Sequence, residues 1–250
     1  MSKTIAIHSF RGGTGKSNIT ANLSYALAAA GRRVGVIDTD IQSPGIHVLL
    51  GGHPPAGHTL NEFLWGRTAI DTVAQDVSTA LGLPPGRLFL IPSSMNMGDI
   101  AQVLKQGYSV GRLNQGFQDL VAKLGLDYLL IDTHPGLNEE TLLSIAVSDL
   151  LLVVMRPDQQ DFQGTSVTVE VARRLKTRRV LLVINKVSSA HDPAQVRSQA
   201  ESAFGCPVAG VLPLSPKLFE LGSSDLCLRV APREPWAEVL HQVVSVLQAG

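Results

Sequence analysis

The segment Arg11-Gly12-Gly13-Thr14-Gly15-Lys16-Ser17 places three glycines directly before a lysine and a hydroxyl. It follows a short apolar, β-branched run at residues 4–9 and precedes a stretch whose apolar residues recur with helical spacing. A strand that turns through glycines into a helix directs several backbone N–H groups, and the positive end of the helix dipole, at one small volume. The segment therefore predicts a strand-loop-helix unit with a site for a polyphosphate.

Each residue of this loop has an expected role. Gly12, Gly13 and Gly15 allow the backbone to approach a phosphate closely. Lys16 is expected to reach the β- and γ-phosphates, and the Ser17 hydroxyl is expected to bind Mg²⁺. Thr14 and Asn18 complete the expected nucleotide-binding segment. The alternative is a glycine-rich turn that binds nothing, but the glycines, lysine and hydroxyl coincide here with a strand-to-helix context.

Short apolar runs alternate with helical patterns along the chain. The expected strands are residues 4–9, 33–38, 88–91, 128–132, 150–155, 180–185 and 208–212. Because these runs are apolar at consecutive positions, both faces of the strands must be covered, as in parallel strands joined by crossover helices. The sequence predicts an α/β fold: a doubly wound, mostly parallel sheet with helices on both faces.

We expect residues 1–250 to form a single domain, because no repeat of fixed period occurs and 44% apolar residues can fill one core. The first helix is expected to end at Gly31. Residues 51–70, which include Gly51-Gly52-His53-Pro54-Pro55, and residues 83–86 are interpreted as loop insertions.

Composition limits the partners. The 21 basic and 21 acidic residues cancel, so any DNA contact must come from a local patch. The two cysteines, Cys206 and Cys227, lack C-x-x-C spacing and are interpreted as ordinary thiols in a reducing compartment.

The N-terminus enters a strand pattern at once, and the longest largely apolar run, residues 142–155, is shorter than the roughly 20 residues of a bilayer span. We expect a cytoplasmic protein.

The loop departs from the common phosphate-loop pattern, because Phe10 stands in place of the first glycine and Arg11 precedes the glycine pair. In this form it resembles the MinD/ParA family of deviant Walker A ATPases, whose loop reads Lys-Gly-Gly-x-Gly-Lys-Ser/Thr. Three further motifs follow in the family's order, so the resemblance covers nearly the whole chain. It implies a P-loop NTPase fold, ATP and Mg²⁺ as cofactors, and hydrolysis of ATP.

The first further motif, residues 36–45, is similar to the family's switch I. The resemblance gives Asp40 the role of positioning the attacking water, and Asp40 is also expected among the residues that hold Mg²⁺, with Ser17 and Asp132. A carboxylate at the carboxyl end of a parallel strand lies next to the nucleotide crevice and can orient water toward phosphorus. The alternative for Asp38 and Asp40 is to cap a helix that starts near Pro44.

The second motif, residues 128–136, is similar to Walker B and switch II. By resemblance Asp132 would hold the hydration shell of Mg²⁺, and Gly136 would face the γ-phosphate. His134 also lies here, but phosphoryl transfer needs positioning more than proton removal, so His134 is left out of the expected catalytic set of Lys16, Asp40 and Arg11.

The third motif, residues 183–186, resembles the segment that contacts adenine. Asn185 would contact the base, and Pro213 falls where the family packs it. An asparagine at the end of a strand can equally cap a turn.

The family's signature lysine reaches the phosphates of a partner subunit, and Arg11 stands at that position. A guanidinium offers a planar, permanently charged set of donors to phosphate. The resemblance thus implies a homodimer that forms on ATP binding, a slow ATPase stimulated by an unidentified protein partner, and a role in positioning or partitioning cellular cargo. The alternatives are a nucleotide-binding regulatory module with little turnover and an iron–sulfur or metal carrier ATPase of the same superfamily.

Two surfaces bear on the partner. Five cations, Arg173, Arg174, Lys176, Arg178 and Arg179, could contact DNA phosphates non-specifically. The alternative that we favour is charge placed at the C-terminus of a helix. The final helix carries an apolar stripe and no Lys or Arg after Arg233, which predicts packing against the core and no C-terminal membrane tether.

Overall fold

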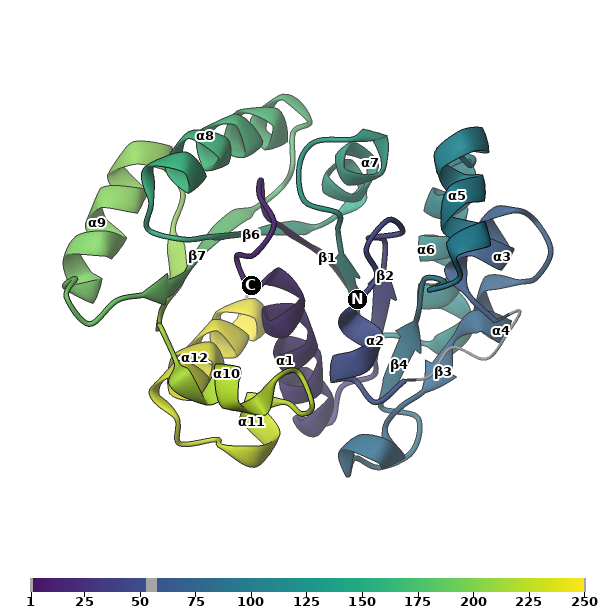
Figure 1. The fold of residues 1–250 in the computed structure, drawn as a ribbon, viewed down its shortest axis with the longest axis horizontal. Helices are drawn as coiled ribbons and strands as arrows, with labels where there is room; N and C mark the ends of the chain where they lie inside the picture. The colour runs from purple at the N-terminus through teal and green to yellow at the C-terminus, as the bar shows by residue number, and fades with distance from the viewer. Residues whose placement is uncertain (1, 53–57, 250) are drawn as a thin grey trace.

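A computed structural model describes residues 2–52 and 58–249. One eight-stranded sheet has the order β3-β4-β2-β5-β1-β6-β7-β8 (Figure 1). All neighbouring strands pair in parallel except β3, which pairs antiparallel with β4. The strands are β1 (Lys3–His8), β2 (Val34–Asp38), β3 (Gln75–Asp76), β4 (Leu88–Ile91), β5 (Tyr128–Asp132), β6 (Leu150–Met155), β7 (Val180–Val187) and β8 (Val208–Pro213). The predicted mostly parallel, doubly wound sheet is confirmed.

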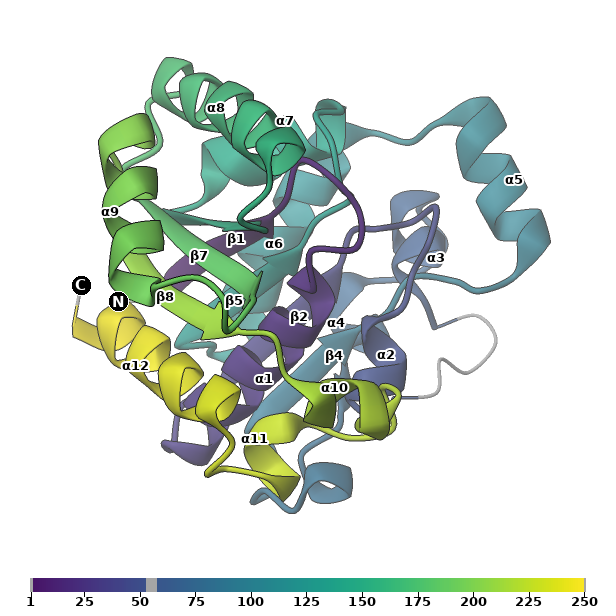
Figure 2. The same cartoon turned by 60° about the vertical axis from the view of Figure 1, so that its left-hand side comes forward.

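Helices cover both faces of the sheet (Figures 1 and 2). As a result, nearly every strand residue is buried. One core layer packs the sheet against α1, α2, α11 and α12, and the layers on the opposite face involve α3 to α9. The helices are α1 (Lys16–Ala29), α2 (Ile46–Leu49), α3 (Leu60–Leu64), α4 (Ile70–Val73), α5 (Met97–Gln106), α6 (Val110–Leu124), α7 (Glu139–Val147), α8 (Gln159–Arg174), α9 (Pro193–Phe204), α10 (Pro216–Leu221), α11 (Cys227–Val230) and α12 (Pro235–Ala249), with a 3₁₀ turn η1 (Thr79–Leu81).

The seven expected strands lie within two residues of their predicted bounds. Helix α1 ends at Ala29 with Ala30 as its C-cap residue, and Gly31, which was expected to close the helix, follows directly with a positive φ of 86° while the Arg32 N–H donates to the Leu27 carbonyl. The final helix α12 buries its apolar stripe, including Trp236 and Leu240.

The region between β2 and β4 is more ordered than predicted. Residues 51–70, expected to be a loop insertion, contain α3 and the first residue of α4, whereas the short strand β3 and η1 lie between the two expected loops, where no element was expected. Leu60, Phe63 and Ile70 from this region are buried in the core, so packing fixes helices too short to be recognised by periodicity. His53, Pro54 and Pro55 of the expected loop lie outside the described residues. Within residues 2–52 and 58–249, no helix is both long and apolar enough to cross a membrane.

Candidate functional site

The loop between β1 and α1 lines a pocket at the carboxyl end of the sheet. Gly15 is the N-cap residue of α1 and has a φ of 89°, a backbone conformation that residues other than glycine rarely adopt. A Cβ at Gly15 would also lie 2.5 Å from the Asn185 amide nitrogen. The pocket has a volume of about 240 Å³ and is lined by Ser9, Gly12, Gly13, Thr14, Gly15, Lys16, Ser17, Asn18, Asp40 and Pro135. The structure thus brings the predicted phosphate-loop residues together with Asp40.

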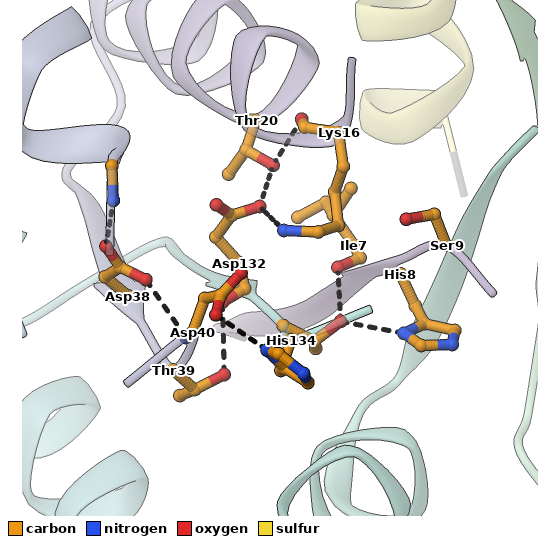
Figure 3. Close-up of polar contacts among 12 residues, drawn as sticks. Ile7, His8, Ser9, Lys16, Thr20, Asp38, Thr39, Asp40, Asp132 and His134 are labelled. Atoms are coloured by element: carbon orange, nitrogen blue, oxygen red, sulfur yellow. Dashed lines mark hydrogen bonds and ion pairs between the residues drawn. The ribbon is translucent and has the colours of Figure 1, made fainter. Parts of the chain in front are cut away.

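Lys16 and Asp132 meet below this loop. The Lys16 ammonium lies 2.8 Å from Asp132 Oδ1, and the Thr20 hydroxyl donates to the same oxygen at 2.9 Å (Figure 3). The two charged side chains are only 6% and 1% exposed. The parallel register places Asp132 beside Ile7 of β1 and Asp38 of β2, so three strand ends converge here.

Asp38 organises the loop that follows β2. Its carboxylate accepts the backbone N–H of Asp40 at 3.0 Å and of Gly45 at 3.2 Å. Gly45 is the N-cap residue of α2, which begins at Ile46 and has no side-chain cap among the described residues, so neither Asp38 nor Asp40 caps this helix as the alternative supposed. Burial, together with the neighbouring Asp132 carboxylate, raises the pKa of Asp38 to about 8.

Asp40 has a partner that the sequence reasoning left out of the catalytic set. His134 Nδ1 lies 2.7 Å from Asp40 Oδ1 (Figure 3). The Ser43 N–H donates to the same oxygen at 3.2 Å. The available signal was the place of His134 two residues after Asp132, at the carboxyl end of β5. Asp40 itself lies at the pocket wall, as expected.

A bulge in β7 holds the loop from the other side. The register between β7 and β8 shifts between Ile184 and Val187. Asn185 donates from Nδ2 to the Thr14 carbonyl at 2.8 Å, and its Oδ1 accepts the Trp236 indole N–H at 3.0 Å. Lys186 has a positive φ of 60° and donates to the Gly13 carbonyl at 2.8 Å. Sequence reasoning selected Asn185 for base contact and missed Lys186.

A second pocket adjoins the first. It has a volume of about 260 Å³ and shares Gly15 and Asn18 with the phosphate-loop pocket. Its other lining residues are Asn185, Lys186, Pro213, Leu214, Ser215, Leu218, Phe219, Gly222 and Ser223. Asn185 and Pro213 therefore lie together, next to the phosphate loop, where the sequence placed the base. The two pockets together offer a polar end and a largely apolar end.

The remaining predicted residues lie around the loop. The Gly136 N–H donates to the Ser9 carbonyl at 3.2 Å, so that backbone donor is already engaged. Arg11 donates to the Gln160 side chain of α8. Phe10, which replaces the first glycine of the common pattern, packs on Gly164 of the same helix, where a Cβ would collide with its ring. Helix α8 thus fixes the outer part of the loop.

The donors at the loop suit Mg²⁺. Ser17, Asp40 and Asp132 supply hydroxyl and carboxylate oxygens, which magnesium prefers as ligands. Side-chain hydrogen bonds from the described residues reach Oδ1 of Asp132 but not its Oδ2, so Oδ2 is open to a ligand. No group of three His, Cys, Asp or Glu side chains among the described residues could hold a metal alone. Magnesium commonly uses one or two carboxylates plus substrate phosphates, so these residues fit a metal that arrives with a nucleotide.

The five-cation segment lies at the amino ends of the parallel strands, opposite the carboxyl ends that bear the phosphate loop. Arg179 directly precedes β7, whereas the phosphate loop follows the end of the parallel strand β1. Arg173 donates to the Phe204 carbonyl, Arg174 pairs with Glu170, and Arg178 pairs with Asp149. Arg173 and Arg174 also occupy the last turn of α8, in agreement with the helix-terminus interpretation. Neither Lys176 nor Arg179 forms an ion pair with another described residue.

The two cysteines are buried on opposite faces of the sheet. Cys206 belongs to the core layer under α8 and α9, and Cys227 to the layer under α1 and α12. Burial raises the pKa of both thiols. The sheet prevents the two sulfurs of one chain from binding the same metal cluster.

A parallel sheet that leads through a glycine loop with Lys16 and Ser17 into a helix, with Asp132 at the neighbouring strand end, defines a P-loop nucleotide-binding protein. The family model described as "ParA: NUBPL iron-transfer P-loop NTPase" matches residues 1–247. The chain belongs to this ParA family of P-loop NTPases, as the resemblance indicated. The expected cofactors, ATP and Mg²⁺, are confirmed at the level of the family.

The relatives differ in their described roles. An uncharacterized ATP-binding protein of Methanocaldococcus jannaschii is 28% identical over 250 residues, which cover 99% of this chain and 88% of the relative. An iron-sulfur cluster carrier protein of the same organism is 34% identical over 178 residues, which cover 68% of this chain and 55% of that protein. The septum site-determining protein MinD of Pyrococcus horikoshii, solved with Mg-ADP, has a TM-score of 0.84 at 22% identity and covers 100% of this chain and 98% of its own. This likeness shows the shared fold.

Proposed function

We propose that the chain is a cytoplasmic, single-domain ATP-dependent dimerisation switch with weak, partner-stimulated ATPase activity that positions or partitions cellular cargo. The observation that carries the proposal is the pair of pockets joined at Gly15 and Asn18. A triphosphate fits the end lined by Lys16 and Ser17, and a purine fits the apolar end lined by Asn185 and Pro213.

In this proposal Lys16 binds the β- and γ-phosphates, Gly136 faces the γ-phosphate, and Asp40 orients the attacking water. The backbone of Gly12, Gly13, Thr14 and Gly15 surrounds the phosphates, and Asn18 lies between phosphates and base. Ser17, Asp132 and Asp40 would hold Mg²⁺, which would supply positive charge against the phosphate oxygens. Lys16 shares Asp132 Oδ1 with Thr20, so Thr20 keeps that carboxylate in place when Lys16 turns to a phosphate.

Arg11 is proposed to contact the phosphates of the partner subunit. Its guanidinium lies at the loop's outer side, held by Gln160, so it needs only a change of side-chain rotamer to leave the chain's own surface. Arg11→Ala is expected to reduce ATP-dependent dimerisation, whereas Gln160→Ala, which releases Arg11, is expected to preserve it. Unchanged dimerisation and hydrolysis in Arg11→Ala would refute the role in trans.

The test of the switch is the mass of the Asp40→Ala variant in solution, measured by light scattering after size exclusion. With ATP and Mg²⁺ the variant is expected to run at twice the chain mass, because bound ATP is retained. Without nucleotide, and in Lys16→Ala with ATP, the mass is expected to remain that of one chain. An Asp40→Ala mass that does not respond to ATP contradicts the proposal. Mass spectrometry of proteins that co-purify with the trapped dimer identifies the client and the activating partner.

The regulatory alternative is a module that binds ATP but hardly hydrolyses it, so it differs from the proposed switch in the rate of phosphate release. Single-turnover phosphate release by the parent and by Asp40→Ala separates the two. A parent that releases phosphate faster than the variant supports hydrolysis as part of the cycle. Equal rates support the alternative and remove Asp40 from the mechanism.

The second candidate is an iron–sulfur carrier, which the family description and the Methanocaldococcus relative favour. The placement of Cys206 and Cys227 on opposite faces of the sheet argues against it. Anaerobic reconstitution with iron and sulfide is expected to leave the protein colourless. A bound cluster lost in Cys206→Ser or Cys227→Ser would favour the carrier.

We propose that the dimer binds a protein surface rather than DNA. Three cations of the basic segment, Arg173, Arg174 and Arg178, already have intramolecular partners. A gel shift at low salt, with and without ATP, is expected to show no ATP-dependent complex. A complex that is lost in Lys176→Glu/Arg179→Glu would assign the segment to DNA.

A further inference from the structure

Asp40 is fixed through one oxygen. His134 Nδ1 and the Ser43 N–H both contact Oδ1, and no hydrogen bond from the described residues reaches Oδ2. A carboxylate held in this way keeps one side-chain conformation and leaves one oxygen open at the wall of the phosphate-loop pocket. This arrangement suits a carboxylate whose second oxygen must accept a hydrogen bond from a water molecule.

The hydrogen bond between His134 and Asp40 determines which ring nitrogen of His134 carries a proton. An ionised carboxylate only accepts, so His134 must donate from Nδ1. Because the acceptor is a charged carboxylate, the hydrogen bond from His134 to Asp40 is stronger than a hydrogen bond between neutral groups. At 2.7 Å it is also the shorter of the two contacts to Asp40 Oδ1, so His134 contributes more to the orientation of the carboxylate than the Ser43 N–H at 3.2 Å.

The position of His134 is itself fixed by the backbone on both sides. Thr133 donates to the Ile7 carbonyl through its N–H at 3.2 Å and through its hydroxyl at 3.0 Å. The Gly136 N–H donates to the Ser9 carbonyl at 3.2 Å. These bonds attach the segment that carries His134 to the end of β1 and the start of the phosphate loop. The imidazole therefore aligns the loop after β2 with the strand end that bears Asp132 (Figure 3).

We propose that His134 is a positioning residue for ATP hydrolysis: it orients Asp40 so that Oδ2 meets the attacking water. The inference rests on the proposed ATPase function. His134 acts through Asp40, so its loss should reduce the rate of the chemical step and leave nucleotide binding largely intact.

Two substitutions separate this role from simple packing. In His134→Asn the amide nitrogen can replace Nδ1 as donor to Asp40, whereas His134→Phe keeps the ring and removes the donor. Single-turnover phosphate release is expected to slow roughly ten- to a hundredfold in His134→Phe, because small misplacements of reacting groups cost rates of this order. His134→Asn is expected to recover most of the rate. ATP affinity is expected to match the parent in both, and His191→Phe, at an exposed loop histidine, serves as the matched control.

The outcomes are distinguishable. A parent that binds and hydrolyses ATP, with His134→Phe at the parental rate or faster, overturns the role of His134 and leaves the proposed function intact. Equal loss in His134→Asn and His134→Phe also overturns it, because the hydrogen bond to Asp40 then does not explain the effect. A parent that neither binds nor hydrolyses ATP overturns the proposed function, and this inference falls with it.

Discussion

Lys16 and Asp132, 116 positions apart in the chain, form a buried ion pair with 2.8 Å between Nζ and Oδ1. The pair connects the first residue of α1 to the last residue of β5. Because both side chains are removed from water, each depends on the other for compensation of its charge. The pair therefore links the stability of the fold to the residues that we assign to phosphate and metal.

Removing Lys16 should leave Asp132 as a buried charge with Thr20 as its remaining side-chain donor. Lys16→Met is expected to lower the free energy of unfolding by about 3 kcal/mol, as for other buried pairs that lose one partner. The double variant Lys16→Met/Asp132→Asn is expected to recover part of this loss. Urea unfolding of the parent and both variants measures the difference. A Lys16→Met variant as stable as the parent would show that the buried Asp132 carboxylate does not depend on Lys16 for compensation of its charge.

Asn185 should matter to both the fold and the nucleotide. Asn185→Leu leaves the Thr14 carbonyl and the Trp236 indole N–H without their partner, and is expected to cost about 2 kcal/mol or more of stability. Asn185→Asp retains an acceptor for Trp236 but places a carboxylate against the Thr14 carbonyl. It is expected to fold and to bind ATP more weakly than the parent. Equal ATP affinity in Asn185→Asp and the parent, measured by calorimetry, would separate Asn185 from the phosphate loop.

Gly164 provides the space that Phe10 occupies. Gly164→Ala inserts a methyl group into the Phe10 ring and is expected to destabilise the protein by about 1–3 kcal/mol, as for other overpacked sites. In the Phe10→Ala background the same substitution is expected to cost much less, because the ring is gone. A thermal-unfolding double-mutant cycle gives the coupling energy. Additive effects would mean that the ring does not pack on Gly164.

His8 should make stability depend on pH. Burial and the nearby Lys16 charge lower the pKa of His8 to about 3, whereas an unfolded histidine titrates near 6.5. Below the unfolded value the unfolded chain binds the extra proton, so the contribution of neutral His8 is lost as the pH falls from about 6.5 toward 3. Between about pH 7.5 and pH 5 the loss should be about 2 kcal/mol.

His8→Asn keeps a donor for the Thr133 hydroxyl and removes the titration. Its free energy of unfolding is therefore expected to change with pH by about 2 kcal/mol less than that of the parent over the same interval, whatever its absolute stability. Parallel slopes for the two proteins in urea titrations at both pH values would exclude His8 as the titrating group.

The sequence predicted the sheet well because seven strands are apolar at consecutive positions and the loop at residues 11–17 marks the first crossover. It did not predict β3, since Gln75 and Asp76 form only two antiparallel pairs and carry no apolar pattern. Among site residues, periodicity and motifs select positions near strand ends but not their partners. The contact of His134 with Asp40, the positive φ of Lys186 at the β7 bulge, and the contact of Arg11 with Gln160 all depend on tertiary geometry.

Calorimetric titration of ATP with Mg²⁺ into the full chain and into the Lys16→Ala variant tests whether residues 11–17 bind a triphosphate. The joined pockets predict saturable binding of one ATP per chain in the parent, and binding too weak to saturate in Lys16→Ala. A parent that takes up no adenine nucleotide at saturating concentrations would contradict the assignment of residues 11–17 to a triphosphate, and with it the proposed switch.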